Sequence, residues 1–102
     1  MAYYLGLDGG GTKTECALAQ DETILARAVG GTIKILRASI EEANRNLDDL
    51  LRTIFTQSGI SSDSITGTCI GLSGSSVPRI ADWAIQALHA RVSGDVDRKS
   101  VV

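Results

Sequence analysis

The sequence predicts a mixed α/β fold, in which an antiparallel meander of three strands is followed by strand–helix units in the order β-β-β-α-β-α. Three observations support this fold class. Residues 3–29 contain three short, mostly apolar segments separated by glycines and polar turn residues. Residues 39–58 and 78–91 repeat apolar side chains at the spacing of an amphipathic helix. A further apolar segment, residues 65–72, lies between these two helices.

The meander is predicted to have strands at residues 3–8, 15–19 and 23–29. Three consecutive glycines interrupt the chain between the first and second strands, and the polar residues 20–22 form a turn between the second and third. A loop follows the third strand from Thr32 to Ala38.

The first helix is predicted to begin at Ser39, because Ser39 and Glu42 form a capping box that satisfies amide groups of the first turn. Gly59 is suited to end it as a left-handed cap. Its apolar face is expected to bury Ile40, Ala43, Leu47, Leu50, Leu51 and Ile54.

The second helix is predicted to begin at Pro78, a residue that the first helical turn tolerates. Another strand is expected to begin near Val96. The apolar face of this helix is expected to consist of Ile80, Trp83, Ala84, Ala87 and Leu88.

Composition excludes several classes of protein. The chain has 102 residues, with 10 Lys and Arg against 12 Asp and Glu and no basic cluster, so nucleic-acid binding is not expected. No apolar run approaches the roughly 20 residues that span a membrane. The N-terminus has no charged region typical of a secretory signal, so a cytoplasmic location is expected.

The last six residues are interpreted as foreign to the domain. Residues 97–102 are polar where an apolar strand is expected, and one set of codons for them reads as a widely used sequencing adapter. We therefore expect residues 1–96 to be an incomplete N-terminal subdomain and residues 97–102 to be a non-native tail. A genuine solvated tail is the alternative.

The glycine loop, residues 9–12, is the main candidate for a functional site. Glycines allow backbone amides to approach a phosphate closely and to adopt positive φ, and Thr12 adds a hydroxyl donor. Lys13 offers a positive charge, and Asp8 is a carboxylate suited to a hydrated Mg²⁺. The sequence fits neither the Walker A nor the dinucleotide-binding pattern. A glycine-rich hairpin turn without function is the alternative.

Residues 7–14, Leu-Asp-Gly-Gly-Gly-Thr-Lys-Thr, resemble the phosphate-1 motif of the acetate/sugar kinase–Hsp70–actin superfamily. The triple glycine resembles the BadF/BadG/BcrA/BcrD ATPase family, which includes N-acetylglucosamine kinase-like proteins. The resemblance covers residues 3 to about 96. It implies a ribonuclease H-like, actin-type ATPase domain, of which this chain contains the β-β-β-α-β-α portion.

The resemblance also implies roles for individual residues. Asp8 would position Mg²⁺ through water, and the loop would hold the β- and γ-phosphates of ATP through Gly9, Gly10, Gly11, Thr12 and Lys13.

A second group of residues resembles the substrate side of the family's cleft. Residues 30–36 resemble the segment that contacts the sugar, with Thr32 and Lys34 as candidates for substrate binding. Lys34 stands about where the kinases tend to have Asn, which leaves the identity of the sugar open. Ser73 and Gly74 resemble the family's Leu-Ser-Gly segment beside the substrate cleft.

The resemblance implies that the full-length protein is a homodimeric, ATP-dependent kinase that transfers the γ-phosphoryl group to a hydroxyl of N-acetylglucosamine or glucosamine. The catalytic base, a second phosphate loop and the adenosine site would follow residue 96. Phosphoryl transfer needs groups on both sides of the nucleotide, so the chain alone is expected to be inactive. The alternatives are an ATPase that drives a partner reductase or dehydratase, and a non-enzymatic nucleotide switch like actin or Hsp70.

Three other residues suggest weaker interpretations. His89, near the end of the second helix, is expected to be solvated. Cys16 and Cys69 match no metal-binding spacing, so both are expected to be buried, unreactive thiols. Iron–sulfur ligation is the alternative for the cysteines.

Overall fold

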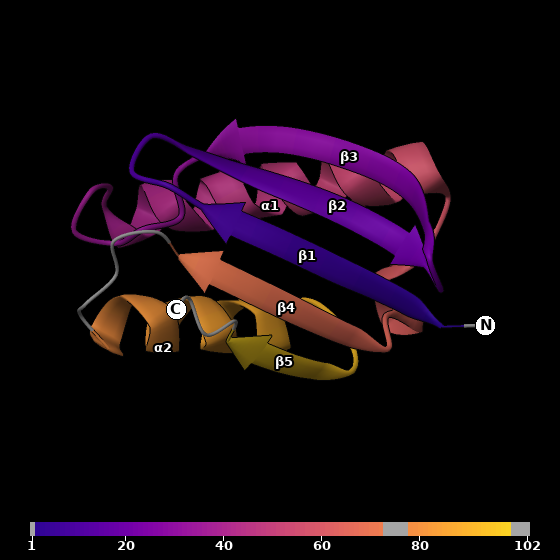
Figure 1. The fold of residues 1–102 in the computed structure, drawn as a ribbon. Helices are drawn as coiled ribbons and strands as arrows, with labels where there is room; N and C mark the ends of the chain where they lie inside the picture. Colours follow the sequence, from indigo (N-terminus) through magenta and orange to yellow (C-terminus); the bar gives the residue numbers. More distant parts are fainter. Residues whose placement is uncertain (1, 73–77, 99–102) are drawn as a thin grey trace.

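The centre of the molecule is a five-stranded mixed sheet with strands in the spatial order β3-β2-β1-β4-β5 (Figure 1). The structure, a computed structural model, describes residues 2–72 and 78–98. The strands are β1 (Tyr3–Gly9), β2 (Lys13–Gln20), β3 (Thr23–Gly31), β4 (Gly67–Leu72) and β5 (Asp95–Arg98).

The central strand β1 pairs antiparallel with β2 and parallel with β4. In the β1–β4 ladder Gly9 is opposite Leu72, so the two strands end together at one edge of the sheet. The predicted meander is therefore confirmed, and so is a strand near Val96, since β5 pairs with β4.

Helix α1 (Ile40–Ser58) has the predicted ends. The Ser39 side chain accepts a hydrogen bond of 3.1 Å from the amide of Glu42, and Gly59, at φ 72°, donates from its amide to Phe55 O. Ile40 was expected in the core, but it is 49% exposed. Its side chain belongs to the first turn and leans toward the N-terminus, beyond the packed face that starts at Ala43.

A 3₁₀ turn, η1 (Ser62–Ser64), leads into β4, and helix α2 (Pro78–His89) follows. The predicted start at Pro78 is confirmed. Trp83 is half-buried at the margin of the core rather than inside it, and His89 is exposed as expected. The Arg91 guanidinium joins the two helices, with Nε donating to Asp48 Oδ1 at 2.7 Å and Nη2 donating to Asn44 Oδ1 at 2.9 Å.

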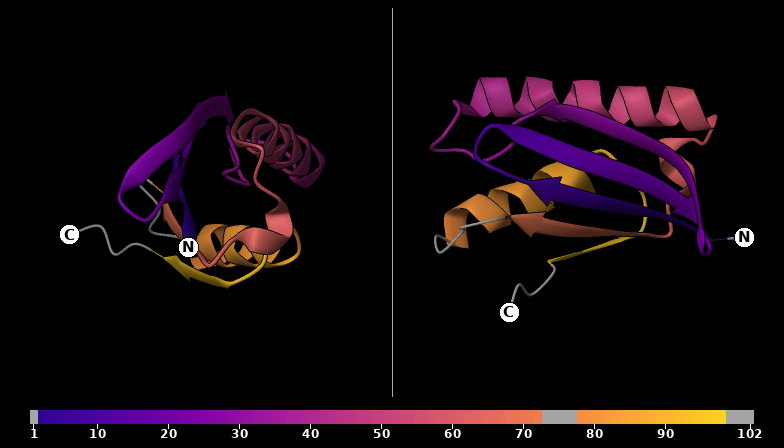
Figure 2. Two further views of the ribbon diagram at one scale, coloured as in Figure 1. Left: turned by 90° about the vertical axis from the view of Figure 1, so that its right-hand side faces the viewer. Right: turned by 45° about the horizontal axis from the view of Figure 1, so that its top comes forward.

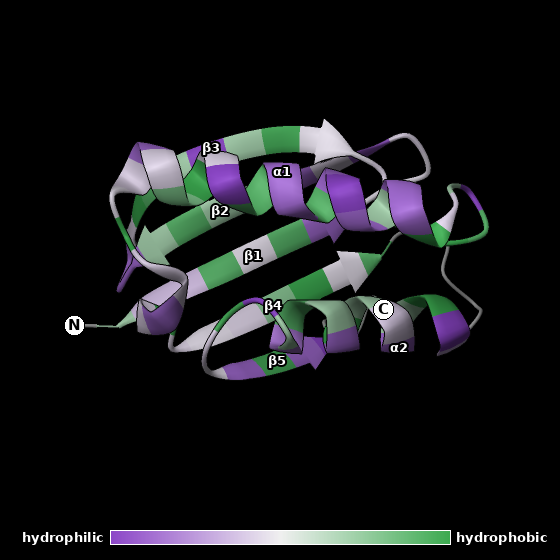
Figure 3. Cartoon of the chain, turned by 180° about the vertical axis from the view of Figure 1, so that it is seen from behind, coloured by the Kyte–Doolittle hydropathy of each residue, from purple (hydrophilic) through white to green (hydrophobic). Residues whose placement is uncertain are grey.

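Both helices cover the same face of the sheet (Figures 2 and 3). The core lies between them and the inward side chains of the strands. No helix in residues 2–72 and 78–98 is both long and apolar enough to span a bilayer. The largest fully buried side chains are Leu5, Leu18, Ile33, Leu47, Leu50, Ile54, Ile70, Leu88 and Thr14.

The two cysteines lie on opposite faces of this sheet. Cys16 points into the core, and burial raises the pKa of its thiol to about 12. Cys69 was also expected to be buried, but it is exposed. Because side chains alternate along a strand, the buried neighbours Thr68 and Ile70 leave Cys69 on the face without helices.

Candidate functional site

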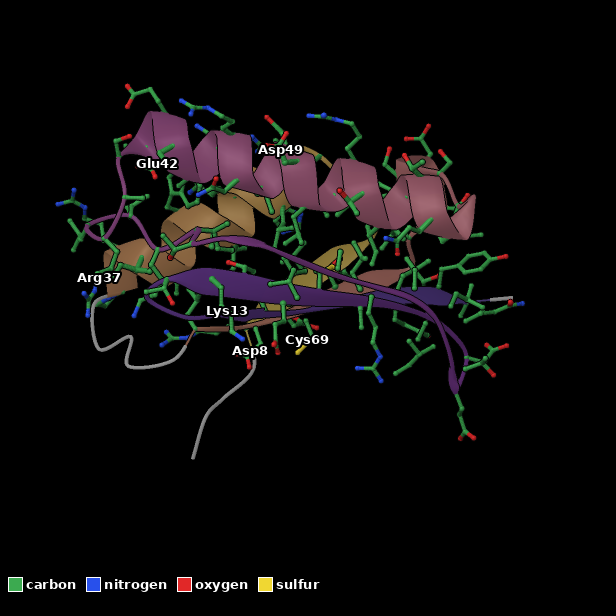
Figure 4. All side chains as sticks on the ribbon, turned by 90° about the horizontal axis from the view of Figure 1, so that it is seen from above. Asp8, Lys13, Arg37, Glu42, Asp49 and Cys69 are labelled. Atoms are coloured by element: carbon green, nitrogen blue, oxygen red, sulfur yellow. The ribbon has the colours of Figure 1, made fainter. Side chains whose placement is uncertain are left out.

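The glycine loop lies at the edge of the sheet where β1 and β4 end. Residues 10–12 connect β1 to β2, and the amide of Gly10 donates to Lys13 O at 2.8 Å across this connection. Figure 4 shows Asp8 and Cys69 projecting from the sheet face away from α1, with Arg37 beyond the end of the sheet. The loop therefore stands between the open face and the segment that precedes α1.

The structure explains Gly9, the first glycine of the loop, by close packing of neighbouring atoms rather than by a positive backbone φ angle. A Cβ on Gly9 would lie 2.6 Å from Leu72 Cδ2, which is too close for an unstrained contact. The expected positive φ is absent, since in the described part of the chain positive φ occurs at Asp21, Leu36, Gly59 and Gly94. A side chain at position 9 would therefore force the buried Leu72 side chain or the end of a strand to move.

Two backbone donors of the loop are unused within residues 2–72 and 78–98. The amides of Gly11 and Thr12 form no hydrogen bond there, and the Thr12 side chain is exposed. Amides and a hydroxyl that lack a protein acceptor are the groups that bind phosphate oxygens in glycine-rich loops.

Asp8 lies directly opposite Glu15 across the β1–β2 ladder, on the exposed face. Two like charges in this position destabilise a strand pair. Lys13 Nζ partly offsets them, at 3.4 Å from Glu15 Oε1, whereas Asp8 forms no ion pair with any described residue. A divalent cation at Asp8 would reduce this repulsion, and Mg²⁺ is commonly held by one or two carboxylates and several waters.

Thr32 links the glycine loop to the segment before α1. Its hydroxyl donates to Gly10 O at 2.7 Å and accepts from the amide of Lys34 at 3.1 Å. Asn46 of α1 donates from Nδ2 to Thr32 O at 2.9 Å. Thr32 and Lys34 are only 9% and 8% exposed. The structure therefore brings the predicted substrate segment against the predicted phosphate loop.

Two residues near the loop were missed by sequence reasoning. Asn46 lies three residues after Ala43 and four before Leu50, which are both buried, so a polar residue on this apolar face of α1 was a usable signal. Arg37 had no local signal, because its approach to Gly11 comes from the fold. Of the other predicted site residues, Ser73 and Gly74 lie outside the described residues.

The family model described as the BadF/BadG/BcrA/BcrD ATPase family matches residues 5–100 of the chain. The chain belongs to this family. The five-stranded mixed sheet with its two helices confirms the predicted fold class, part of an actin-type ATPase domain.

Similar proteins include amino-sugar kinases. The chain is 32% identical over 75 residues to the N-acetylmuramic acid/N-acetylglucosamine kinase of Clostridium acetobutylicum, covering 72% of this chain and 24% of that protein. A structure of a candidate N-acetylglucosamine kinase from Chromobacterium violaceum matches with a TM-score of 0.65 and 26% identity, over 98% of this chain and 35% of that one.

A second candidate N-acetylglucosamine kinase, from Porphyromonas gingivalis, matches with a TM-score of 0.74, over 96% of this chain and 33% of that chain. At 22% identity this likeness shows the fold alone. The chain therefore spans about a quarter to a third of the length of these relatives.

Proposed function

We propose that this chain supplies the phosphate- and magnesium-binding part of an ATP-dependent amino-sugar kinase. The observation that carries the proposal is the arrangement at the end of β1. There Asp8 projects on the open face beside Glu15, and the Gly11 and Thr12 amides lack acceptors within the described residues. This combination of donors and carboxylates suits a triphosphate with its metal ion.

ATP and Mg²⁺ fit the residues present. The uncovered amides, the Thr12 hydroxyl and Lys13 would hold phosphate oxygens, and Asp8 would hold Mg²⁺ through its water ligands. Bound Mg²⁺ would offset charge on the phosphates during transfer of the γ-phosphoryl group. A Cβ at Gly9 would displace Leu72 and shift the loop relative to β4, which would move these donors.

The acceptor is proposed to be an amino sugar that binds on the side of residues 30–36. Support comes from the Clostridium acetobutylicum relative, whose name gives N-acetylmuramic acid and N-acetylglucosamine as its substrates. Thr32 places this segment against the loop through Gly10 O. Lys34, Ser73 and Gly74 are proposed to lie near the sugar.

The test is an assay of the complete gene product with Mg·ATP and a panel of N-acetylglucosamine, glucosamine and N-acetylmuramic acid. We expect ADP formation that depends on one of these sugars, and no turnover by the 102-residue chain alone. ADP release that depends on a partner reductase and on no sugar would instead support the coupled ATPase. Nucleotide binding without any turnover would support a switch protein.

A further inference from the structure

Arg37 lies beside the glycine loop although it belongs to the segment before α1. Its guanidinium Cζ and Nε atoms are 3.6 Å, and Nη2 is 3.8 Å, from the position that a Cβ on Gly11 would occupy. The side of Gly11 on which another residue would carry its side chain thus faces a charged, planar group.

The backbone holds Arg37 in this place. The amides of Arg37 and Ala38 both donate to Lys34 O at 3.1 Å, which forms a tight turn. Leu36, inside the turn, has φ 83°, a left-handed conformation that is unfavourable for a non-glycine residue. Strain of this kind persists where surrounding contacts fix the backbone. Here the Thr32 hydroxyl bond to Gly10 O fixes the start of the segment against the loop.

The charge of Arg37 is not balanced by the described residues. Its side chain is exposed, and its guanidinium forms no ion pair or hydrogen bond with residues 2–72 or 78–98. Lys13, the other cation at the loop, lies 3.4 Å from Glu15. Arg37 is therefore a cation beside Gly11 that forms no ion pair with a carboxylate of the described residues.

We propose that Arg37 is a phosphate ligand, whose guanidinium binds the terminal phosphates of a nucleotide held by the glycine loop. The planar, permanently charged fork of arginine matches two phosphate oxygens at once, and such charge-assisted bonds are among the strongest in proteins. The inference rests on the proposed use of this loop for phosphate. It assigns Arg37 to the nucleotide and not to an acidic group of the sugar.

The test measures binding of inorganic tripolyphosphate and of Mg·ATP to the 102-residue chain by calorimetry at low ionic strength. Arg37→Ala is expected to weaken the binding of both ligands at least tenfold, because a charge-assisted hydrogen bond is lost. Arg37→Lys is expected to recover part of the affinity, because it restores charge without the fork. Added salt is expected to lower the affinity of the wild-type chain for both ligands more than it lowers the affinity of Arg37→Ala.

The matched control is Arg27→Ala, which removes an exposed cation from the middle of β3 and is expected to change affinity less than twofold. Equal melting temperatures for the Arg37 variants would exclude a folding defect. Affinities within twofold of wild type for Arg37→Ala, or an equal loss in Arg27→Ala, would overturn the inference.

Two further results are distinguishable from each other. Failure of the wild-type chain to bind tripolyphosphate would overturn the inference together with the phosphate role of the loop. The complete protein could instead bind phosphate through Arg37 but phosphorylate no amino sugar. That result would contradict the proposed acceptor and support the inference about Arg37. An effect of Arg37→Ala only on N-acetylmuramic acid, and not on either phosphate ligand, would overturn it in favour of the sugar.

Discussion

Both connections of the meander reverse the direction of the chain between antiparallel strands, but they do so with different residues. Between β2 and β3 the chain reverses through Asp21 and Glu22, with Asp21 at φ 53° and no glycine. Three glycines stand at the end of β1 and in its connection to β2, although positive φ within the described residues occurs elsewhere. Chain reversal alone therefore does not require the glycines. Close packing against Leu72 gives Gly9 a physical reason, whereas a Cβ on Gly11 would make only ordinary van der Waals contact with Arg37.

The largest effect is expected from Gly9→Ala. The added Cβ would lie 2.6 Å from the buried Leu72 Cδ2, so the packed Leu72 side chain or the strand ends must shift. We expect a loss of about 1–3 kcal/mol in the free energy of unfolding, as for overpacked cores. Gly6→Ala in the same strand is the control, because its Cβ would meet nothing within 4 Å. Equal free energies of unfolding for the two variants, measured in denaturant, would contradict the packing role of Gly9.

Asp8→Asn separates binding from stability at the same loop. Removal of the carboxylate is expected to weaken Mg·ATP binding about tenfold, equivalent to ~1.4 kcal/mol, while Mg²⁺-free tripolyphosphate binds as well as before or better. The melting temperature is expected to hold or rise slightly, because the like-charge pair with Glu15 is lost. Calorimetry with and without Mg²⁺ measures the difference. Equal weakening in both conditions would argue against a metal role.

Thr32→Val tests the bond between the loop and the segment before α1. It leaves Gly10 O without its hydroxyl donor and the Lys34 amide without its acceptor, at a cost of about 1–2 kcal/mol. Hydrogen exchange at the Lys34 amide is expected to accelerate, and Thr32→Ser should restore its protection. Unchanged exchange in Thr32→Val would show that the hydroxyl does not hold the two segments together.

The smallest effect is expected at the second connection. Asp21→Gly relieves the cost of φ 53° but increases the entropy of the unfolded chain, so the two terms nearly cancel. We expect a change within about 0.5 kcal/mol in the free energy of unfolding and unaltered phosphate binding. A loss of phosphate affinity in this variant would show that the two connections are not independent.

Short-range patterns were enough to predict the elements of this fold. The Ser39 cap, the Gly59 cap, the Pro78 start and the meander all follow from residues within a few positions of each other, and the structure confirms them. These signals depend on local hydrogen bonds and side-chain periodicity, which the sequence contains directly. The motif at residues 7–14 likewise identified the family that the family model matches.

Those short-range patterns could not predict the contacts between residues that are far apart in the sequence. The burial of Cys16 and the exposure of Cys69 depend on which face of the sheet the helices cover. The link from Thr32 to Gly10, the role of Asn46 and the position of Arg37 depend on how the segment before α1 returns to the end of β1. Local residue preferences therefore specified the strands, the helices and the loop with its carboxylate Asp8, whereas long-range packing brought the Thr32 hydroxyl and the Arg37 guanidinium to that loop.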